Sequence, residues 1–463
     1  MARATSAGSG AGETQGPSPC RVDALVAEIG STTTVVSAFA GLRDHPATTP
    51  RVVGQGVAAT SVAAGDVTLG VSAARAELEA ALGRPVVPEV TLATSSAAGG
   101  LRMTVHGLTR RMTARAAREA ALGAGAVVKY QTAGRLRGHD LGEIDAVRPN
   151  LILLAGGVEG GDCDTVLFNA AQLARLEVRP TVVYAGNSVV CGDAQDLLER
   201  AGFRVKLTNN VYPAVDELDI VPARHVIHDA FEEHITHAPG MERIGEVVTG
   251  GILPTPGAVL IAAERLAEEV GDLVVVDVGG ATTDVHSVTD GSPEIAALMT
   301  EPQPHSKRTV EGDLGTYVSA PHVVEMLAAQ ERPVRLPPAL PQSPDEVAAA
   351  LTLTHFAAVT AVQRHAGELA HLYTPTGRQT VARGRDLTAC RLVVGTGGAL
   401  TRLPGAEAAL ADARARGGGE RLLPPPDARV VLDRDYVFAC CGALLQRFAP
   451  PAVTALLRAS IRV

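Results

Sequence analysis

The sequence predicts an α/β protein built from two related domains, with a smaller α/β block inserted between them. Short apolar, β-branched runs alternate with helical segments along most of the chain, a pattern typical of parallel sheets covered by helices. Three of these runs end in glycine-rich turns. The 463 residues suffice for two or three domains with sizeable cores. We expect the first domain at 21–145, the inserted block at 146–240 and the second domain at 241–463.

Composition argues against several classes of protein. The formal net charge of −9 disfavours a nucleic-acid-binding surface. No apolar run is long enough to span a membrane, and six cysteines without a C-x-x-C pair favour a reduced, cytoplasmic chain. Residues 1–20 are rich in Ala, Gly, Ser and Pro and lack the apolar core of a signal peptide, so we expect a disordered tail there.

The first glycine-rich turn follows an apolar strand near the N-terminus. Glu28 lies near the end of that strand, and the turn contains Gly30, Ser31, Thr32 and Thr33. Hydroxyl and backbone N–H groups in such a turn can donate to phosphate oxygens. A carboxylate beside them can hold a hydrated Mg²⁺. One such hairpin is a weak indication of a nucleotide site.

The chain between the hairpins contains the expected insertion. A strand is expected over 89–96, followed by a helix over 113–125 whose Arg115 and Arg118 we place on an exposed face. The inserted block has a Rossmann-like βαβαβ pattern, with strands and helices expected over 151–154, 165–176, 181–185, 187–201 and 203–207. No G-x-G-x-x-G opens a helix there, so the block does not match the dinucleotide fingerprint.

Four histidines follow the block at His225, His228, His234 and His237. Their number would suit a metal site, but the spacing is unlike that of a zinc site and no cysteine assists. We interpret them as surface or interface histidines. Pro256 opens an apolar helix that we expect to run to about residue 269.

The second hairpin is the most informative stretch of the chain. A buried strand, VVV at 274–276, delivers Asp277, and a glycine pair, two threonines and Asp284 follow. The glycines allow a tight turn and close approach of backbone N–H groups to a ligand. Both carboxylates can hold a hydrated Mg²⁺. The candidate phosphate-binding residues of this hairpin are Gly279, Gly280, Thr282 and Thr283.

The C-terminal half contributes a loop, a third turn and a final helix. Glu311 and Asp313 lie in a Gly-containing loop and suit either a solvated turn or a group that orients water at a γ-phosphate. Glu159, in the inserted block, is a weaker candidate of the same type. The third turn follows an apolar strand and comprises Gly395, Thr396, Gly397 and Gly398. A proline-rich loop lies at 336–344, and an apolar helix is expected over 436–449.

The three turns, in this order and at these separations, resemble the phosphate-1, phosphate-2 and adenosine motifs of the actin/Hsp70/sugar-kinase ATPase superfamily. Three further runs narrow the resemblance: LLAGGVEGG at 153–161, VYAGN at 183–187 and RTVEGDLG at 308–315. With the hairpins, they are similar to the glutamate mutase accessory protein family, called GlmL or MutL. The resemblance extends over nearly the whole chain after residue 20.

The resemblance implies an actin-like ATPase fold that clamps ATP and Mg²⁺ between its hairpins. It implies that Gly30, Ser31, Thr32 and Thr33 hold phosphate oxygens from one side and that Gly279, Gly280, Thr282 and Thr283 hold them from the other. Gly395, Thr396, Gly397 and Gly398 would seat adenosine. Glu28, Asp277 and Asp284 would position Mg²⁺ through water, and Asp277, Asp284 and Glu311 would be the catalytic candidates. The helices at 256–269 and 436–449 would cross between the domains.

The family also implies a partner, an adenosylcobalamin-dependent mutase of the glutamate mutase type, and a role as an ATP-dependent reactivating chaperone. Two positions depart from the family pattern. Glu28 stands where Asp is usual, and Val35 stands where Lys is frequent. The longer acid and the missing charge near the phosphates predict ATP binding with slow hydrolysis. A small-molecule kinase of the same superfamily and a non-hydrolysing scaffold protein are the alternative interpretations.

Overall fold

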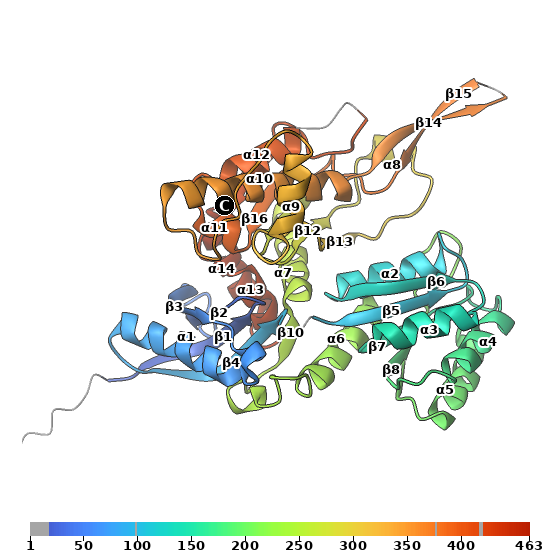
Figure 1. The fold of residues 1–463 in the computed structure, drawn as a ribbon, viewed down its shortest axis with the longest axis horizontal. Coiled ribbons are helices and arrows are strands. Elements are labelled where there is room, and N and C mark those ends of the chain that lie inside the picture. Colours follow the sequence, from blue (N-terminus) through green and yellow to red (C-terminus); the bar gives the residue numbers. More distant parts are fainter. Residues whose placement is uncertain (1–17, 98–99, 376, 416–419) are drawn as a thin grey trace, which may run out of the picture.

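The computed structural model of the chain describes residues 18–97, 100–375, 377–415 and 420–463. Most of the expected tail, residues 1–17, lies outside this part of the chain. The described residues form three five-stranded sheets and one two-stranded sheet. Figure 1 shows two sheet-containing domains joined by α7, with the third sheet and its helices to one side.

The first domain is built on the sheet β10-β4-β1-β2-β3. Its central strand β1 pairs antiparallel with β2 and parallel with β4. At the two edges, β3 pairs antiparallel with β2, and β10 pairs parallel with β4. The strands are β1 (Cys20–Ile29), β2 (Thr33–Ala40), β3 (Arg51–Ala59), β4 (Val86–Ser95) and β10 (Ile252–Pro254). The helical elements are η1 (Val62–Ala64) and α1 (Val67–Leu82), which packs on β3.

The second domain repeats this design with the sheet β13-β12-β11-β16-β17. Its central strand β11 pairs antiparallel with β12 and parallel with β16, and the outer pairs again are antiparallel and parallel. The strands are β11 (Leu273–Val278), β12 (Thr283–Val288), β13 (Ser306–Glu311), β16 (Leu392–Thr396) and β17 (Arg429–Leu432). The helices are α8 (Pro293–Ala296), α9 (Ala320–Ala328), α10 (Pro344–His365), α11 (Gly398–Arg402) and α12 (Glu407–Ala415).

Equal strand order and equal strand directions make the two domains structural relatives, as the repeated hairpins predict. Apolar, β-branched side chains fill both central strands because each strand is covered on both faces; every apolar side chain of β11 is buried. The predicted fold class is therefore confirmed. It is an α/β protein with two related domains and an inserted α/β block, the architecture expected of an actin-like fold.

Two helices connect the domains. The helix α7 (Thr255–Val270) leaves the first sheet at β10 and enters the second at β11, as expected for a crossing helix. The helix α13 (Phe438–Leu444) follows β17 and packs on α7, β1 and β4, so it returns to the first domain. It is shorter than the expected 436–449, and α14 (Pro450–Ile461) follows it. One apolar core joins these helices to both sheets.

The inserted block contains the sheet β6-β5-β7-β8-β9, in which every pair is parallel. Its strands are β5 (Arg102–Gly107), β6 (Val127–Ala133), β7 (Leu151–Leu154), β8 (Thr181–Tyr184) and β9 (Val205–Leu207). Its helical elements are α2 (Thr113–Gly123), α3 (Gly138–Val147), α4 (Asp164–Leu173), η2 (Ser188–Val190) and α5 (Cys191–Arg200). The elements α6 (Val221–Ile235) and η3 (Ile244–Glu246) lead back to the first domain.

Strand pairing gives a different division from the expected boundaries. Two strands of the block's sheet, β5 and β6, lie before residue 146, and β10 belongs to the first sheet although it follows residue 241. Sequence patterns locate strands but not their partners. We propose that the block begins at about residue 102 and that β10 completes the first domain.

The helix α2 is not the exposed surface helix that its arginines suggested. Nine of its eleven residues are buried, because α2 lies between the block's own strands and β13 of the second domain. Arg118 is exposed, whereas Arg115 is half-buried and pairs with Glu301. The two-stranded sheet, β14 (Glu368–Thr374) with β15 (Gly377–Arg383), projects from the second domain in Figure 1.

Candidate functional site

The two predicted hairpins form equivalent turns. In the first, the N–H of Gly30 donates to the carbonyl of Thr33 at 3.0 Å, and in the second the N–H of Gly279 donates to the carbonyl of Thr282 at 2.9 Å. Glu28 lies opposite Val35 in the first hairpin, and Asp277 lies opposite Asp284 in the second. The two halves therefore present the same backbone shape, with different side chains at matching positions.

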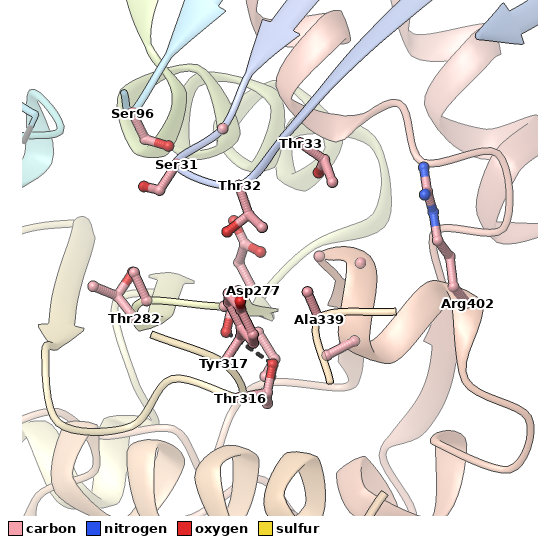
Figure 2. Close-up of a pocket in the computed structure, with 18 of the residues that line it drawn as sticks. Ser31, Thr32, Thr33, Ser96, Asp277, Thr282, Thr316, Tyr317, Ala339 and Arg402 are labelled. Carbon is pink, nitrogen blue, oxygen red and sulfur yellow. Dashed lines mark hydrogen bonds between the residues drawn. The ribbon is translucent and has the colours of Figure 1, made fainter. Parts of the chain in front are cut away.

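Both turns line one pocket between the domains, together with part of the third turn. In Figure 2, Ser31 and Thr32 approach from the first domain, and Asp277 and Thr282 approach from the second. Twelve of the sixteen predicted site residues line this pocket: Glu28, Gly30, Ser31, Thr32, Thr33, Asp277, Gly279, Gly280, Thr282, Asp284, Gly397 and Gly398. Residues nearly 370 positions apart in the chain (30 and 398) thus meet at one site.

Three carboxyl groups are concentrated at the bottom of this pocket. Burial, together with the nearby charges of Asp284 and Glu28, raises the pKa of Asp277 well above its usual range. Burial also raises the pKa of Glu28 to about 7, while a hydrogen bond from Tyr436 opposes the rise. Within the described residues, the Asp277 carboxylate accepts no hydrogen bond. Its oxygens are therefore free for a ligand or a water molecule.

Asp284, in contrast, is held by protein groups. Nε and Nη2 of Arg308 contact its Oδ1 at 2.7 and 2.6 Å, and the Thr282 hydroxyl donates to its Oδ2 at 3.0 Å. Both members of the ion pair are buried. The arginine is not among the residues that line the pocket.

Glu28 has a partner that the sequence did not suggest. The hydroxyl of Tyr436 donates to a Glu28 carboxylate oxygen across the domain boundary. Tyr436 adopts a left-handed backbone (φ 52°) just before α13, and the guanidinium of Arg402 lies over its ring, 5.6 Å from the ring centroid. Tyr436 and Arg402 both line the pocket. No local pattern marks either residue, because both reach the site only through tertiary packing.

Some residues of the third turn line the pocket, and others are part of the core. Gly397 and Gly398 line the pocket, but Gly395 lies among leucine side chains of the core. The Thr396 hydroxyl donates to the buried carboxylate of Asp433 at 2.9 Å, which also accepts from the backbone ahead of α13. Thr396 and Gly395 therefore support the turn rather than line the pocket.

Two further predicted residues lie outside the pocket. The Thr283 hydroxyl points into the protein and donates to the carbonyl of Leu314. Glu311 ends β13 and pairs with Arg364 at 2.7 Å, and Arg364 also contacts both oxygens of Asp313. Thr282 lies in the turn and lines the pocket, whereas Thr283 is the first residue of β12 and its side chain is buried.

The remaining sequence candidates lie elsewhere. Glu159 bonds to Ser188 and Asn210 within the inserted block. The histidine group on and after α6 is dispersed: His234 contacts Asn150, whereas His237 contacts the carbonyl of Glu233. In the ranges that the structure describes, no three His, Cys, Asp or Glu side chains are arranged to hold a metal ion directly. Nor is any helix in those ranges long and apolar enough to cross a membrane.

Several lining residues have no equivalent among the predictions. The proline-rich loop contributes residues 337–341, the loop after β13 contributes Thr316 and Tyr317, and the start of α7 contributes Thr255 and Pro256. The unusual proline density of 336–344 was the one signal available in the sequence. It indicated a loop, but not its position.

Comparison with known proteins gives one family. The sequence profile described as "MutL protein" matches residues 24–461. Protein MutL of Clostridium tetanomorphum is 34% identical over 397 residues, covering 80% of this chain and 86% of that protein.

Among solved structures, the nucleotide-free acetone carboxylase is 12% identical and covers 91% of this chain and 70% of its own, with a TM-score of 0.38. The nucleotide-free diol dehydratase-reactivating factor is also 12% identical and covers 91% of this chain and 99% of its own, with a TM-score of 0.35. Family membership rests on the two sequence matches, which extend over most of the chain. The chain belongs to the MutL family, the glutamate mutase accessory proteins.

Proposed function

We propose that this protein is an ATP-binding reactivating factor for an adenosylcobalamin-dependent mutase of the glutamate mutase type. The observation that carries the nucleotide site is the pair of equivalent turns, Gly30–Thr33 and Gly279–Thr282, on opposite walls of one pocket. Backbone N–H groups and the hydroxyls of Ser31 and Thr32 are the phosphate donors that this pocket offers.

The acid cluster fits a hydrated Mg²⁺. Asp277, Asp284 and Glu28 bring up to three negative charges into a buried site, and burial, followed by repulsion from the other two carboxylates, raises the pKa of Asp277. Oxygen ligands and water are what Mg²⁺ prefers, and a bound ion would neutralise charge on the carboxylates and the phosphates. Glu28 and Asp277 would hold its water shell from the two domains.

Asp277 is also the group best suited to orient an attacking water. Its carboxylate accepts no hydrogen bond from the described residues, and its raised pKa brings it nearer the range of an effective general base. Asp284 is less suited, because Arg308 and Thr282 already occupy its oxygens. Gly397 and Gly398 would leave room for adenosine against backbone, beside Arg402.

The family supplies the partner. A radical mutase that loses its adenosyl group retains damaged cobalamin in a closed site, and release of that cobalamin requires the mutase to open. A two-domain protein that closes on ATP and opens after hydrolysis can favour the open mutase by binding it better than the closed one. The crossing helices α7 and α13 are the connections about which the two domains would move.

A non-hydrolysing scaffold protein is the second candidate. Glu28 is engaged by Tyr436, and Val35 places no charge opposite it. Both features favour ATP binding with slow turnover. Measured ATP affinity without hydrolysis, in the presence of the partner mutase, would support the scaffold over the reactivating ATPase.

The decisive experiment is reactivation of a cobalamin-inactivated glutamate-type mutase by this protein with ATP and Mg²⁺. Asp277→Ala should abolish reactivation, whereas Asp427→Ala, which alters a side chain that is 78% exposed in a surface ion pair, should not. Full activity of Asp277→Ala would refute the proposed site. Phosphorylation of a small metabolite in the absence of any mutase would refute the chaperone role and favour a kinase.

A further inference from the structure

A polar seam connects the inserted block to the second domain directly behind the pocket. We call it the α2 seam, and it joins one face of α2 and the segment after it to the chain around β13. Its members on the block are Arg115, Glu119, Leu122 and Ala126, and those on the second domain are Glu301, Lys307 and Arg308.

The contacts run along α2 toward the pocket. Arg115 pairs with Glu301 at the outer end. Nζ of Lys307 contacts Oε1 of Glu119 at 3.1 Å, and both side chains are largely buried. At the inner end, Nη1 of Arg308 donates to the carbonyls of Leu122 and Ala126, each at 2.9 Å.

Arg308 is the member that connects the seam to the pocket. Its Nε and Nη2 contact Asp284, which lines the pocket. Its third nitrogen, Nη1, donates to the carbonyl of Leu122 at the C-terminal end of α2. Its side chain is 1% exposed, so the contacts are shielded from solvent. Only a planar group with several fixed donors can make both sets of contacts at once.

The carbonyl contacts matter for α2 itself. The last carbonyls of a helix have no partner within the helix, and a positive charge at that end is favoured by the helix dipole. The Leu122 carbonyl already accepts from the N–H of Gly125, so Arg308 adds a further hydrogen bond to it and supplies the positive charge. If its guanidinium moves toward or away from Asp284, the end of α2 loses part of its cap.

Asp284 would be shared if a cation bound in the pocket. Its carboxylate would then lie between two positive charges, that of Arg308 behind it and that of the cation in front. The two positive charges would repel each other across the carboxylate, and burial keeps this repulsion strong because water does not screen it. Cation binding and the hold of Arg308 on Asp284 are therefore opposed.

We propose that Arg308 couples the nucleotide pocket to the inserted block. Arg308 holds α2 against β13 when no nucleotide is bound. Its contacts weaken when the Mg²⁺ of bound MgATP lies beside Asp284 and repels the guanidinium. The inference rests on the proposed nucleotide site. The inference adds that the inserted block responds to ATP, as well as the first and second domains.

Thermodynamic linkage makes the coupling reciprocal. If bound MgATP loosens the seam, then loosening the seam far from the pocket must strengthen the binding of MgATP. Metal-free ATP places no cation beside Asp284, so its affinity should not change when the seam is loosened. If the seam were only structural, its loss would weaken the binding of both MgATP and metal-free ATP, or would change neither.

The first test uses variants that do not touch the pocket. Glu119→Gln combined with Lys307→Met removes the central ion pair without leaving an unpaired buried charge, and Arg115→Met alone opens the outer end. Lys129→Met changes an exposed lysine of β6 and is the matched control. Isothermal titration with ATP is run with Mg²⁺ and with EDTA.

We expect the seam variants to bind MgATP about five-fold or more tightly than wild type, with unchanged affinity for metal-free ATP and with Lys129→Met equal to wild type. Equal or weaker MgATP binding in both seam variants would overturn the coupling. If the wild-type protein binds no ATP in this assay, the proposed function fails, and the coupling fails with it.

The second test measures hydrogen exchange of the amides at 113–126. In the wild-type protein, saturating MgATP should speed their exchange, because the end of α2 is held less firmly. In Arg308→Lys, a charge remains beside Asp284 but the fork to the two carbonyls is lost, so exchange should be fast with or without MgATP. Unchanged or slower exchange in wild type, with binding shown by titration, would overturn the coupling alone.

Discussion

Replacing Gly397 by alanine should distort the junction between the third turn and the second hairpin. Gly397 has a φ of 87°, and a Cβ built on it would lie 2.4 Å from Oδ1 of Asp277 and 2.5 Å from the carbonyl oxygen of Val278. The left-handed backbone alone costs alanine about 1–2 kcal/mol. The overlap with fixed backbone adds about 1–3 kcal/mol, as for other overpacked sites.

Gly405 provides the matched control. Its φ is 83°, but nothing lies within 4 Å of a Cβ built there. Gly405→Ala should therefore show only the backbone cost, and the difference between the two variants isolates the overlap. Because Asp277 must move to relieve that overlap, Gly397→Ala should also weaken MgATP binding, and Gly405→Ala should not.

Urea unfolding gives the loss of stability, and isothermal titration gives the affinity for MgATP. We expect Gly397→Ala to lose about 2–5 kcal/mol and Gly405→Ala about 1–2 kcal/mol. Equal losses in the two variants, with equal ATP affinity, would refute the inference that the third turn packs directly on the acid of the second hairpin.

Three further predictions test the placement of individual residues. Between pH 4.5 and about 7 the protein should lose stability as pH rises, on the order of 3 kcal/mol, because burial raises the pKa of Glu28 to about 7 and the unfolded chain ionises first. Glu28→Gln should lack this part of the slope of thermal midpoint against pH; identical slopes would contradict it. Thr283→Val should lose about 1–3 kcal/mol by leaving a buried carbonyl unpaired, while MgATP affinity stays unchanged in titration; lost affinity would place Thr283 at the pocket. Glu311→Gln should slow ATP hydrolysis far less than Asp277→Asn, because Glu311 pairs with Arg364 outside the pocket. Equal loss of turnover would argue against that placement.

Much of the proposed nucleotide site could be predicted from the sequence because its main parts are local. A strand, a tight turn and a neighbouring strand are specified within about a dozen residues, so Glu28 to Thr33 and Asp277 to Asp284 show their design without tertiary information. Repetition of that design predicted two related domains, and equal strand order in the two sheets confirmed it.

Local patterns could not decide which side of a strand meets the pocket. Thr282 and Thr283 are equally suited to bind phosphate by residue type, yet only Thr282 lines the pocket, because β12 packs Thr283 against the carbonyl of Leu314. Gly395 lies within β16 among core leucines, whereas Gly397 follows that strand in the turn and lines the pocket. Alternation along a strand is a property of the sequence, but the face that becomes core is set by the neighbouring elements.

The sequence by itself determined the fold class, the family and the position of each phosphate turn, since these depend on short runs of chain. Only the tertiary structure decided which partners complete the site. Tyr436 reaches Glu28 from 408 residues away, and Arg308 meets the end of α2 from 182 and 186 residues away. Such contacts depend on how separate sheets and helices dock, and the energy of docking comes from burial spread over many residues rather than from any local motif.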